Sequence, residues 1–538
     1  MAARLTCVVM AAMAAHGTRV GRARAGIASR NLVNLARNVP VKSRSLQLFP
    51  HAKKSTVHSR SLITNAQVDT EDKQEKKDSL LPSWLPLFAV PALGGSLFGY
   101  DIGATSSVVR LLGTGESDLG SLDALQLGLV ASLPLLGAVL ASAAIIFTGD
   151  EKVGRKDELY IASFLYAVGT LVQSLAPSLS LVLGGRLLYG LGIGVAMHAA
   201  PLYIAETSPD NLRGKLVSLK EAAIVLGIVA GYTSGAVFNN GDPAAWRNVF
   251  EVALPFEALM AISTYLFLSE SPRWLALRGR GKEAIESLMR GQALEEADAK
   301  ADVDRMMEVR KMTQSDESTS FFDRSKELAG DPTNRKALLI GVGLVLWQQL
   351  SGQPSVLYYA NRIFEKAGLG FEAAIGVGLF KTVMTLLSVG LVEDPKWGRK
   401  SLLLAGTSGM TVSLAALSAL FATSGGEEPS AAAILACVIA FVGFYQIGFG
   451  PVTWLILSEI FPLKVRSAAL SIGTLSNFAS NFLVSALFEV ERESLGEAAL
   501  FAQFAIIAAL AVAFEYTQVF ETQGLSLEEI ESKLKDSQ

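Results

Sequence analysis

The sequence predicts an all-α membrane protein with twelve transmembrane helices, arranged as two six-helix repeats with a short helical intracellular insert between them. Three observations lead to this prediction. Of the 538 residues, 50% are apolar and 18% are charged. The apolar residues form runs of bilayer-spanning length, and charged motifs of the first half recur in the second. The formal net charge of −3 indicates no bulk attraction to nucleic acid.

The first 68 residues differ from the rest of the chain. From Met1 to Val68 there is no Asp or Glu, while Arg, Lys, Ser and Ala recur. Such acid-free segments are typical of organelle targeting, so residues 1–68 are predicted to be a disordered leader outside the fold. The short apolar stretch Leu5 to Ala15 leaves a two-part presequence open, and a disordered cytosolic tail is the other alternative. Residues 69–83 are charged and are interpreted as a soluble spacer.

About twelve stretches of roughly 20 mostly apolar residues follow this spacer. Six precede a polar segment whose charged residues have helical spacing, and six follow it, so the polar segment is expected to form short surface helices. The stretches lie near 84–107, 125–148, 158–176, 180–203, 216–238, 249–268, 337–361, 371–393, 401–421, 432–457, 467–489 and 498–520. The predicted domains are an N-terminal bundle (84–269), an inner-side insert (270–336), a C-terminal bundle (337–520) and an inner-side tail (521–538).

An even number of spans places both termini on one side of the membrane. The loops on that side are richer in basic residues than the opposite loops, which predicts that both termini face inward. The basic residues on the predicted inner side are Lys152, Arg155, Lys156, Arg213, Lys215, Lys396, Arg399, Lys400, Lys464 and Arg466. Those on the opposite side are Arg110, Arg247, Arg362, Lys366 and Arg492.

The two halves repeat each other at offsets of about 250 residues. Three independent matches at a common offset predict that one six-helix unit occurs twice, as in the parallel repeats of membrane transporters. The matched segments are Glu206 to Arg213 with Glu459 to Arg466, Asp150 to Lys156 with Asp394 to Lys400, and Glu270 with Glu521.

These motifs resemble the fingerprints of the sugar porter family within the major facilitator superfamily, over about residues 84 to 535. The most specific segments are Arg186 to Gly194, Ser269 to Arg273, Gln348 to Gly352 and Gly450 to Pro462. Within the family, residues 353–360 and the leader look like the plant and algal plastidic D-xylose–proton symporter-like branch. There are departures, since Glu151 and Pro395 stand where the family's inner-loop motif usually has Asp.

The resemblance implies the major facilitator fold and a monosaccharide (hexose or pentose)–proton symporter that works by alternating access. Its expected partners are a small sugar, a proton and the lipid bilayer. A functional monomer is expected, with no cofactor, metal or nucleic acid. The alternatives are a facilitative uniporter of the same fold and a non-transporting sugar sensor. The expected location is the plastid (chloroplast) envelope, with mitochondrial, vacuolar and plasma membranes as alternatives.

An enzyme is not expected, because no phosphate loop, metal-ligand cluster or Ser/His/Asp set is recognisable. His198 is the only histidine after the leader and is interpreted as a packed helix residue. Cys7 and Cys437 lie far apart and support neither a disulfide framework nor a metal site.

The chain carries an unexplained carboxylate, Asp101, inside its first glycine-rich span. An ionisable group in a membrane-spanning segment indicates a functional site. Asp101 and Arg186 each lie about six residues, or about 9 Å, from the outer end of their helices, so they are expected to pair. The resemblance implies that Asp101 couples the proton and that Arg186 tunes it; a purely structural ion pair is the alternative.

The resemblance also implies a sugar site in the second half. Amides suit hydroxyl groups and aromatic rings suit sugar faces, whereas helix–helix hydrogen bonding is the alternative use of the amides. Pro354 stands where the family often has a sugar-binding Asn, and we expect a helix kink there. The candidate sugar-binding residues are Gln348, Gln349, Tyr358, Trp454, Asn477 and Phe478.

Two charged residues in this predicted pocket depart from the family. Glu221 stands where Gln is common, and Lys381 stands where Asn is common. Because unpaired charges at this depth are very unfavourable, they are predicted to pair across the cavity. The alternative is that each side chain reaches water separately.

A belt of charged residues on the predicted inner side completes the candidate sites. The resemblance assigns them to salt bridges that close the inner side, and a role in setting topology is the alternative. The candidate inner-gate residues are Asp150, Arg155, Glu206, Arg213, Glu270, Arg273, Arg399, Glu459 and Arg466.

Overall fold

The computed structural model describes residues 82, 84–148, 152–209, 212–292, 294–313, 321–366, 368–394, 396–424, 430–525 and 527–536. The chain divides into two units, Met1–Lys77 and Asp78–Gln538, and all described residues belong to the second. Within the described ranges this unit contains helices and connecting segments without strands. The predicted leader (1–68) lies outside the described residues, as does the spacer (69–83) except for residue 82.

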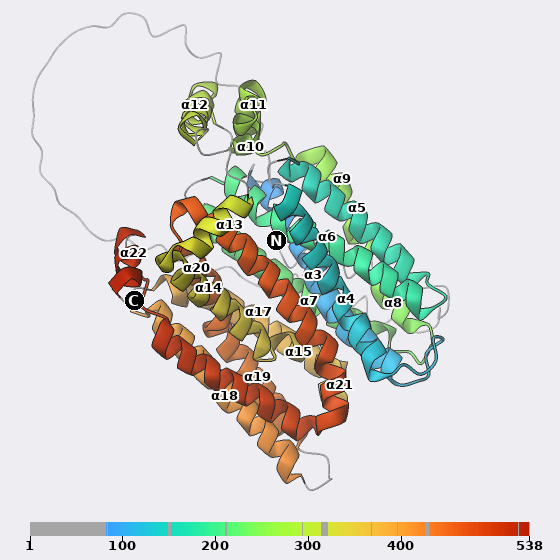
Figure 1. Ribbon diagram of the computed structural model, residues 1–538. Coiled ribbons are helices and arrows are strands. Elements are labelled where there is room, and N and C mark those ends of the chain that lie inside the picture. The colour runs from blue at the N-terminus through green and yellow to red at the C-terminus, as the bar shows by residue number, and fades with distance from the viewer. Residues whose placement is uncertain are drawn as a thin grey trace, which may run out of the picture. The chain divides into compact units, whose positions relative to one another are not determined.

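The first bundle holds α3 to α9 (Figure 1). Helix α3 packs along α7, and α6 packs along both α4 and α5. The span predicted at 249–268 is broken after α8, because a proline in the first turn of α9 cannot donate a backbone hydrogen bond. The bounds are α3 Trp84–Gly113, α4 Ala124–Thr148, α5 Arg155–Ser174, α6 Leu179–Thr207, α7 Arg213–Phe238, α8 Ala245–Glu251 and α9 Leu254–Phe267.

The second bundle holds α14 to α21, drawn from yellow to red in Figure 1. Helix α21 covers two predicted spans, which are separated by a turn at Gly496, whose φ is 77°. The span predicted at 432–457 is broken at Gly448. The bounds are α14 Pro332–Leu350, α15 Gln353–Tyr358, α16 Ala360–Lys366, α17 Phe371–Glu393, α18 Arg399–Thr423, α19 Ala431–Ile447, α20 Phe449–Glu459 and α21 Leu463–Gln518.

The first span of this second bundle is interrupted, close to where the sequence predicts a kink. Gly352 has a φ of 86°, a conformation that few residues other than glycine adopt. Pro354 lies in the first turn of α15, where a missing backbone N–H is tolerated. The break therefore precedes Pro354 and divides the span into α14, α15 and α16.

In the described residues, the segment between the bundles forms four helices, and the tail forms one more. Part of the segment has a small core of its own around Leu275, Leu288 and Val303. Helices α13 and α22 contact the second bundle, and Figure 1 shows α11 and α12 beyond one end of the first. The bounds are α10 Pro272–Leu277, α11 Gly281–Gln292, α12 Glu296–Thr313, α13 Phe321–Gly330 and α22 Leu527–Asp536.

The described residues contain nine helical stretches long and apolar enough to cross a membrane. The stretch 465–518 is bent at Gly496 and holds two of the predicted spans. The more polar α5 and the interrupted α14–α16 account for the remaining two predicted spans. Large apolar side chains such as Phe147, Phe164 and Tyr265 are exposed, as lipid-facing residues are. The protein is an all-helical, multi-span membrane protein.

Candidate functional site

The pairing predicted for Asp101 and Arg186 is present in the structure. The side chains are 2% and 0% exposed, respectively. Arg186 Nη1 donates to Asp101 Oδ1, and Nη2 lies 3.5 Å from Oδ2. The arrangement joins α3 to α6, so a buried ion pair links two helices of the first bundle.

Arg186 is held by more than its carboxylate partner. Its Nε donates to the Val130 carbonyl at 2.8 Å, and Nη2 donates to Thr105 Oγ1 at 2.6 Å. Its guanidinium carbon lies 5.3 Å from the centre of the Phe250 ring. The carbonyl, the hydroxyl and the ring are partners other than Asp101, so loss of the charge on Asp101 would not by itself remove them.

Three of the candidate sugar-binding residues form one amide cluster across α14, α20 and α21. Gln348 donates to the Phe449 carbonyl at 2.6 Å, and Gln349 donates to Gln348 Oε1 at 3.2 Å and to Asn477 Oδ1. The Gln349 Oε1 atom is buried without a hydrogen-bond partner. In this conformation the amides mainly bind protein atoms, and one acceptor remains for another donor.

The other candidate sugar-binding residues form no hydrogen bond with this cluster within the part of the chain that the structure describes. Tyr358 is buried, and its hydroxyl has no hydrogen-bond partner. Trp454 on α20 is 37% exposed. Phe478 packs edge-on against Phe98 of the first bundle, with ring centres 6.3 Å apart. A buried hydroxyl without a partner is unfavourable unless a ligand or water satisfies it, so Tyr358 stays a candidate contact residue.

The ion pair predicted between Glu221 and Lys381 is absent from this structure. Lys381 Nζ donates to Gln446 Oε1 at 2.7 Å, while Glu221 is 57% exposed and pairs with Lys220 at 2.9 Å. The adjacent lysine pairs with the carboxylate, so Glu221 does not require Lys381 as a partner. The prediction of a pair across the cavity is therefore wrong for this conformation.

The inner-gate residues of the first half form a cluster at the start of α5. Arg155 Nε lies 3.7 Å from Glu206 Oε2, which also accepts from Ser271 Oγ. Glu270 Oε1 accepts the backbone N–H of Lys156 at 3.1 Å and that of Ser271 at 2.7 Å. Glu270 thus caps the amino end of α5 from another segment. Burial raises the pKa of Glu270, and these backbone hydrogen bonds oppose the rise.

The second half repeats this cluster at the start of α18. Arg399 Nη2 lies 2.8 Å from Glu459 Oε1, and Thr522 Oγ1 donates to Glu459 Oε2 at 2.8 Å. Glu521 accepts the backbone N–H groups of Arg399 at 2.8 Å and Lys400 at 3.1 Å. The two clusters match residue by residue, and each ion pair joins elements of one half.

Arg466, a further inner-gate candidate, has a different kind of partner. Arg466 donates to the Phe461 carbonyl of its own segment at 3.0 and 3.1 Å, rather than to a carboxylate. Within the described residues, the predicted salt bridge of Arg466 is therefore not found in this conformation. Arg213 and Arg273 are exposed, and Asp150 lies outside the described residues.

The sequence analysis missed a second repeated pair of buried residues. Thr170 on α5 donates to Glu257 Oε1 on α9 at 2.6 Å. In the second half, Thr407 on α18 donates to Glu515 Oε1 on α21 at 2.7 Å. The second oxygen of each carboxyl group is buried without a partner. These sites could have been recognised in the sequence, because Glu257 and Glu515 are each an acidic residue within an apolar run.

A set of polar contacts between the two bundles, near the carboxyl end of α3, was also not predicted from the sequence. The backbone N–H of Asn361 donates to Ser106 Oγ at 3.0 Å, and its Nδ2 donates to Ser107 Oγ at 3.1 Å. Tyr232 donates to the Leu357 carbonyl at 2.8 Å, and an ion pair between Arg110 and Glu365 at 3.4 Å lies nearby. These contacts join the halves on the predicted outer side.

The fold and these clusters can now be compared with known proteins. The family model described as "Sugar (and other) transporter" matches residues 87–534. The chain belongs to this sugar transporter family. This sugar transporter is 43% identical over 467 residues to the D-xylose-proton symporter-like 3, chloroplastic, of Arabidopsis thaliana, covering 83% of this chain and 82% of that protein.

Solved structures agree with this assignment. The partially occluded inward open conformation of the xylose transporter XylE from E. coli matches with a TM-score of 0.69 and 26% identity, covering 82% of this chain and 99% of that one. XylE bound to 6-bromo-6-deoxy-D-glucose, a proton:xylose symporter, matches with a TM-score of 0.67 and 27% identity, covering 84% and 99%. The sugar transporter therefore has the major facilitator fold and is not an enzyme.

Proposed function

We propose that this sugar transporter is a monosaccharide–proton symporter that works by alternating access. The observation that carries the proposal is the buried ion pair between Asp101 and Arg186. The proposal is supported by a relative named as a D-xylose-proton symporter-like protein and by the similar structure described as a proton:xylose symporter.

The electrostatics of the pair suit proton coupling. The attraction of the guanidinium favours the anionic form of this buried carboxyl group, while burial favours its neutral form. Protonation removes this attraction, and Arg186 retains Thr105 and the Val130 carbonyl as partners. Proton binding therefore changes the contact between α3 and α6 without leaving Arg186 unsatisfied, and this change biases the movement of the two halves.

The contacts between the bundles support the same cycle. Asn361, Ser106 and Ser107 join the halves on the predicted outer side, and the similar XylE structure is described as inward open and partially occluded. We propose that the sugar binds between the halves near Gln349 and Tyr358. The proton and the sugar would then leave inward when the outer contacts form, and the inner clusters of Glu206 and Glu459 would rearrange.

Uptake by Asp101→Asn tests the role of the carboxylate. In proteoliposomes with an imposed pH gradient, the wild type is expected to accumulate D-xylose or D-glucose. Asp101→Asn should retain equilibrative uptake without accumulation, because an amide does not take up the coupled proton. Asp118→Asn is the matched control, since Asp118 forms an ion pair with Arg247 at 2.8 Å in a loop and should retain accumulation.

The second candidate is a uniporter of the same fold. The anchoring of Arg186 by Thr105 and Val130 favours it, because a fully satisfied pair can serve as a structural link. Wild-type uptake that never responds to the pH gradient would establish the uniporter and exclude symport. Sugar binding without any uptake would instead point to a sugar sensor.

We place the transporter in the plastid envelope. The relative named as chloroplastic and the acid-free leader over 1–68 support this location. A fusion of residues 1–83 to a fluorescent protein should enter plastids. Accumulation of the fusion in mitochondria or the cytosol would contradict the plastid location and leave the transport proposal untouched.

A further inference from the structure

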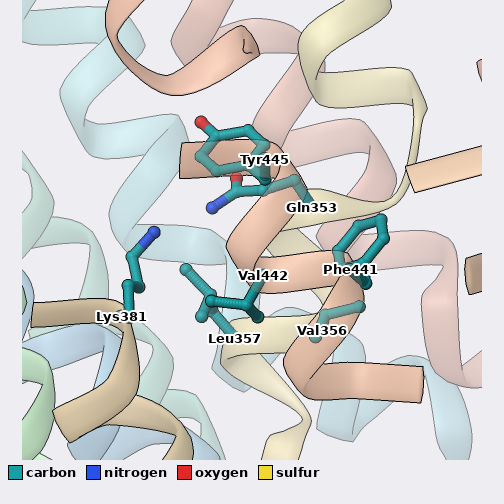
Figure 2. A pocket seen from close by; sticks show the side chains of 7 residues that line it. All are labelled: Gln353, Val356, Leu357, Lys381, Phe441, Val442 and Tyr445. Atoms are coloured by element: carbon teal, nitrogen blue, oxygen red, sulfur yellow. The ribbon is translucent and has the colours of Figure 1, made fainter. Parts of the chain in front are cut away.

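Lys381 is a buried cation that faces a pocket between α15, α17 and α19. It is 5% exposed, and Figure 2 shows its side chain together with Gln353, Leu357, Val442 and Tyr445. The pocket is too narrow for a sugar ring in this conformation, so a ligand would enter it when the two halves move. A charge placed at this depth is expensive and indicates a function.

Neighbouring side chains hold the ammonium group in place. Gln446 Oε1 accepts from Lys381 Nζ at 2.7 Å, and Gln446 Nε2 donates to Thr385 Oγ1 at 2.8 Å. Thr385 in turn donates to the Lys381 carbonyl at 2.8 Å. The ammonium also lies 4.9 Å from the centre of the Tyr445 ring. This network uses one of its three N–H donors and leaves two for another acceptor.

Within the described residues, Lys381 has no carboxylate within ion-pair distance. The charged residue predicted to neutralise it, Glu221, is exposed and pairs with Lys220. Gln446, Thr385 and Tyr445 are neutral hydrogen-bonding or aromatic groups that stabilise a cation but do not neutralise it. Within the described residues, the direct partners of the ammonium group are therefore neutral, and the carboxylate of Glu221 acts on it only from beyond ion-pair distance.

We propose that Lys381 binds the carboxylate of a sugar acid, so that the transported substrates include monosaccharides with one negative charge. This inference rests on the proposed function and deepens it. A single lysine matches a single negative charge. A phosphate ester carries nearly two negative charges, so one of them would have no partner at a single lysine. An amide at position 381 would bind a neutral hydroxyl group equally well, so the lysine selects for the anion.

The proposal changes the charge balance of transport. A proton carried with a neutral sugar moves one positive charge, whereas a proton carried with a sugar carboxylate moves none. An inside-negative membrane potential should therefore drive uptake of D-glucose and leave uptake of D-glucuronate unchanged. These two sugars share the same ring and differ at the carbon that bears the carboxylate.

The test measures uptake of D-glucose, D-glucuronate and glucose 6-phosphate by full-length protein in proteoliposomes. Lys381→Gln should reduce kcat/KM for D-glucuronate by about 10- to 100-fold, the range expected for loss of a hydrogen bond to a charged group. The kcat/KM for D-glucose should change by less than about 3-fold in Lys381→Gln. Lys381→Arg should restore D-glucuronate uptake. Lys396→Gln, the same change in an exposed loop, is the matched control.

Three outcomes would overturn the inference. One is wild-type uptake of D-glucose without uptake of D-glucuronate. A second is faster uptake of glucose 6-phosphate than of D-glucuronate. The third is an equal loss of D-glucose uptake in Lys381→Gln and Glu221→Gln, which would make Lys381 the partner of Glu221. A different result would contradict the proposed symport, namely D-glucose uptake that does not depend on the pH gradient.

Discussion

At the scale of single residues, the buried carboxyl groups differ in what surrounds them. Asp101 has a guanidinium, and Glu489 has two, those of Arg362 at 3.5 Å and Arg492 at 2.6 Å. Glu257 and Glu515 instead accept from one threonine hydroxyl each. A carboxyl group without a cation in an apolar bundle depends on its hydrogen bond, because water does not replace a lost partner.

Thr170→Val and Thr407→Val should therefore destabilise the protein. Each leaves a buried carboxyl group with neither oxygen bonded, and removal of such a partner costs about 1–3 kcal/mol. Thermal unfolding in detergent should show a lower Tm for both variants. Thr170→Ser and Thr407→Ser keep the hydroxyl and are the controls. If Tm decreases equally in the serine and valine variants, the destabilisation comes from altered packing and not from the lost hydrogen bond.

At the scale of elements, glycine allows a close contact between α3 and α7 in the first bundle. A Cβ atom on Gly99 or Gly103 of α3 would overlap the backbone carbonyl oxygen of Ile224 or Ile228 on α7. Gly227 and Gly231 meet the backbone of α3 in the same way. Small residues at such positions let two helix backbones approach closely. This contact sits beside Asp101, so packing and the candidate coupling site share one helix.

Gly99→Ala and Gly184→Ala should have opposite effects. Gly99→Ala forces α3 and α7 apart at a cost of about 1–3 kcal/mol. At Gly184 in α6, nothing lies within 4 Å of an added Cβ atom, so alanine should stabilise the helix by about 0.5–1 kcal/mol. The measurement is the free energy of unfolding or the Tm in matched detergent. A neutral Gly99→Ala variant would contradict the close contact.

Glycine also explains the repeated motif on the predicted inner side. A Cβ atom on Gly154 would overlap the Glu270 carboxylate, and one on Gly398 would overlap that of Glu521. The glycine thus leaves space for a carboxylate that caps the following helix. The arginine after it pairs with a glutamate from a third segment, so one short motif ties three segments together in each half.

At the scale of the whole molecule, the structure is joined across its halves on the predicted outer side. Asn361 reaches Ser106 and Ser107, and Arg110 lies 4.3 Å from the centre of the Phe371 ring. Alternating access requires such contacts to break in every cycle, whereas a static scaffold does not require this.

A cross-link should therefore stop transport. In Ser106→Cys combined with Asn361→Cys, oxidation to a disulfide is expected to join α3 to α16 and to reduce uptake to background, because the two positions are in contact. Either single-cysteine variant, treated in the same way, should retain its uptake. The native Cys437 is present in every variant and cancels in the comparison. Unchanged uptake by fully cross-linked protein would contradict opening at this contact.

Much of the architecture follows from local sequence patterns. Each predicted span coincides with a helix or an interrupted helix, because length and apolar composition decide which segments enter a bilayer. The helix breaks at Gly352, Gly448 and Gly496 could not be predicted from the glycines alone, because glycine also occurs within helices where they pack closely. The position of a break depends on what the neighbouring helix allows.

The sequence by itself determined that this chain crosses the membrane many times, that its halves repeat, and that Asp101 and Arg186 lie at similar depth. Hydropathy, repeat spacing and the rise per residue of a helix are local quantities, so one chain is enough to read them. Only the tertiary structure decided the partners of the buried charges. The buried Lys381 donates to Gln446, the buried Glu257 accepts from Thr170, and Glu221 is exposed and pairs with the adjacent Lys220. A side chain's partner depends on how helices far apart in the sequence approach each other and on which face each helix presents. A single apolar run does not determine either of these.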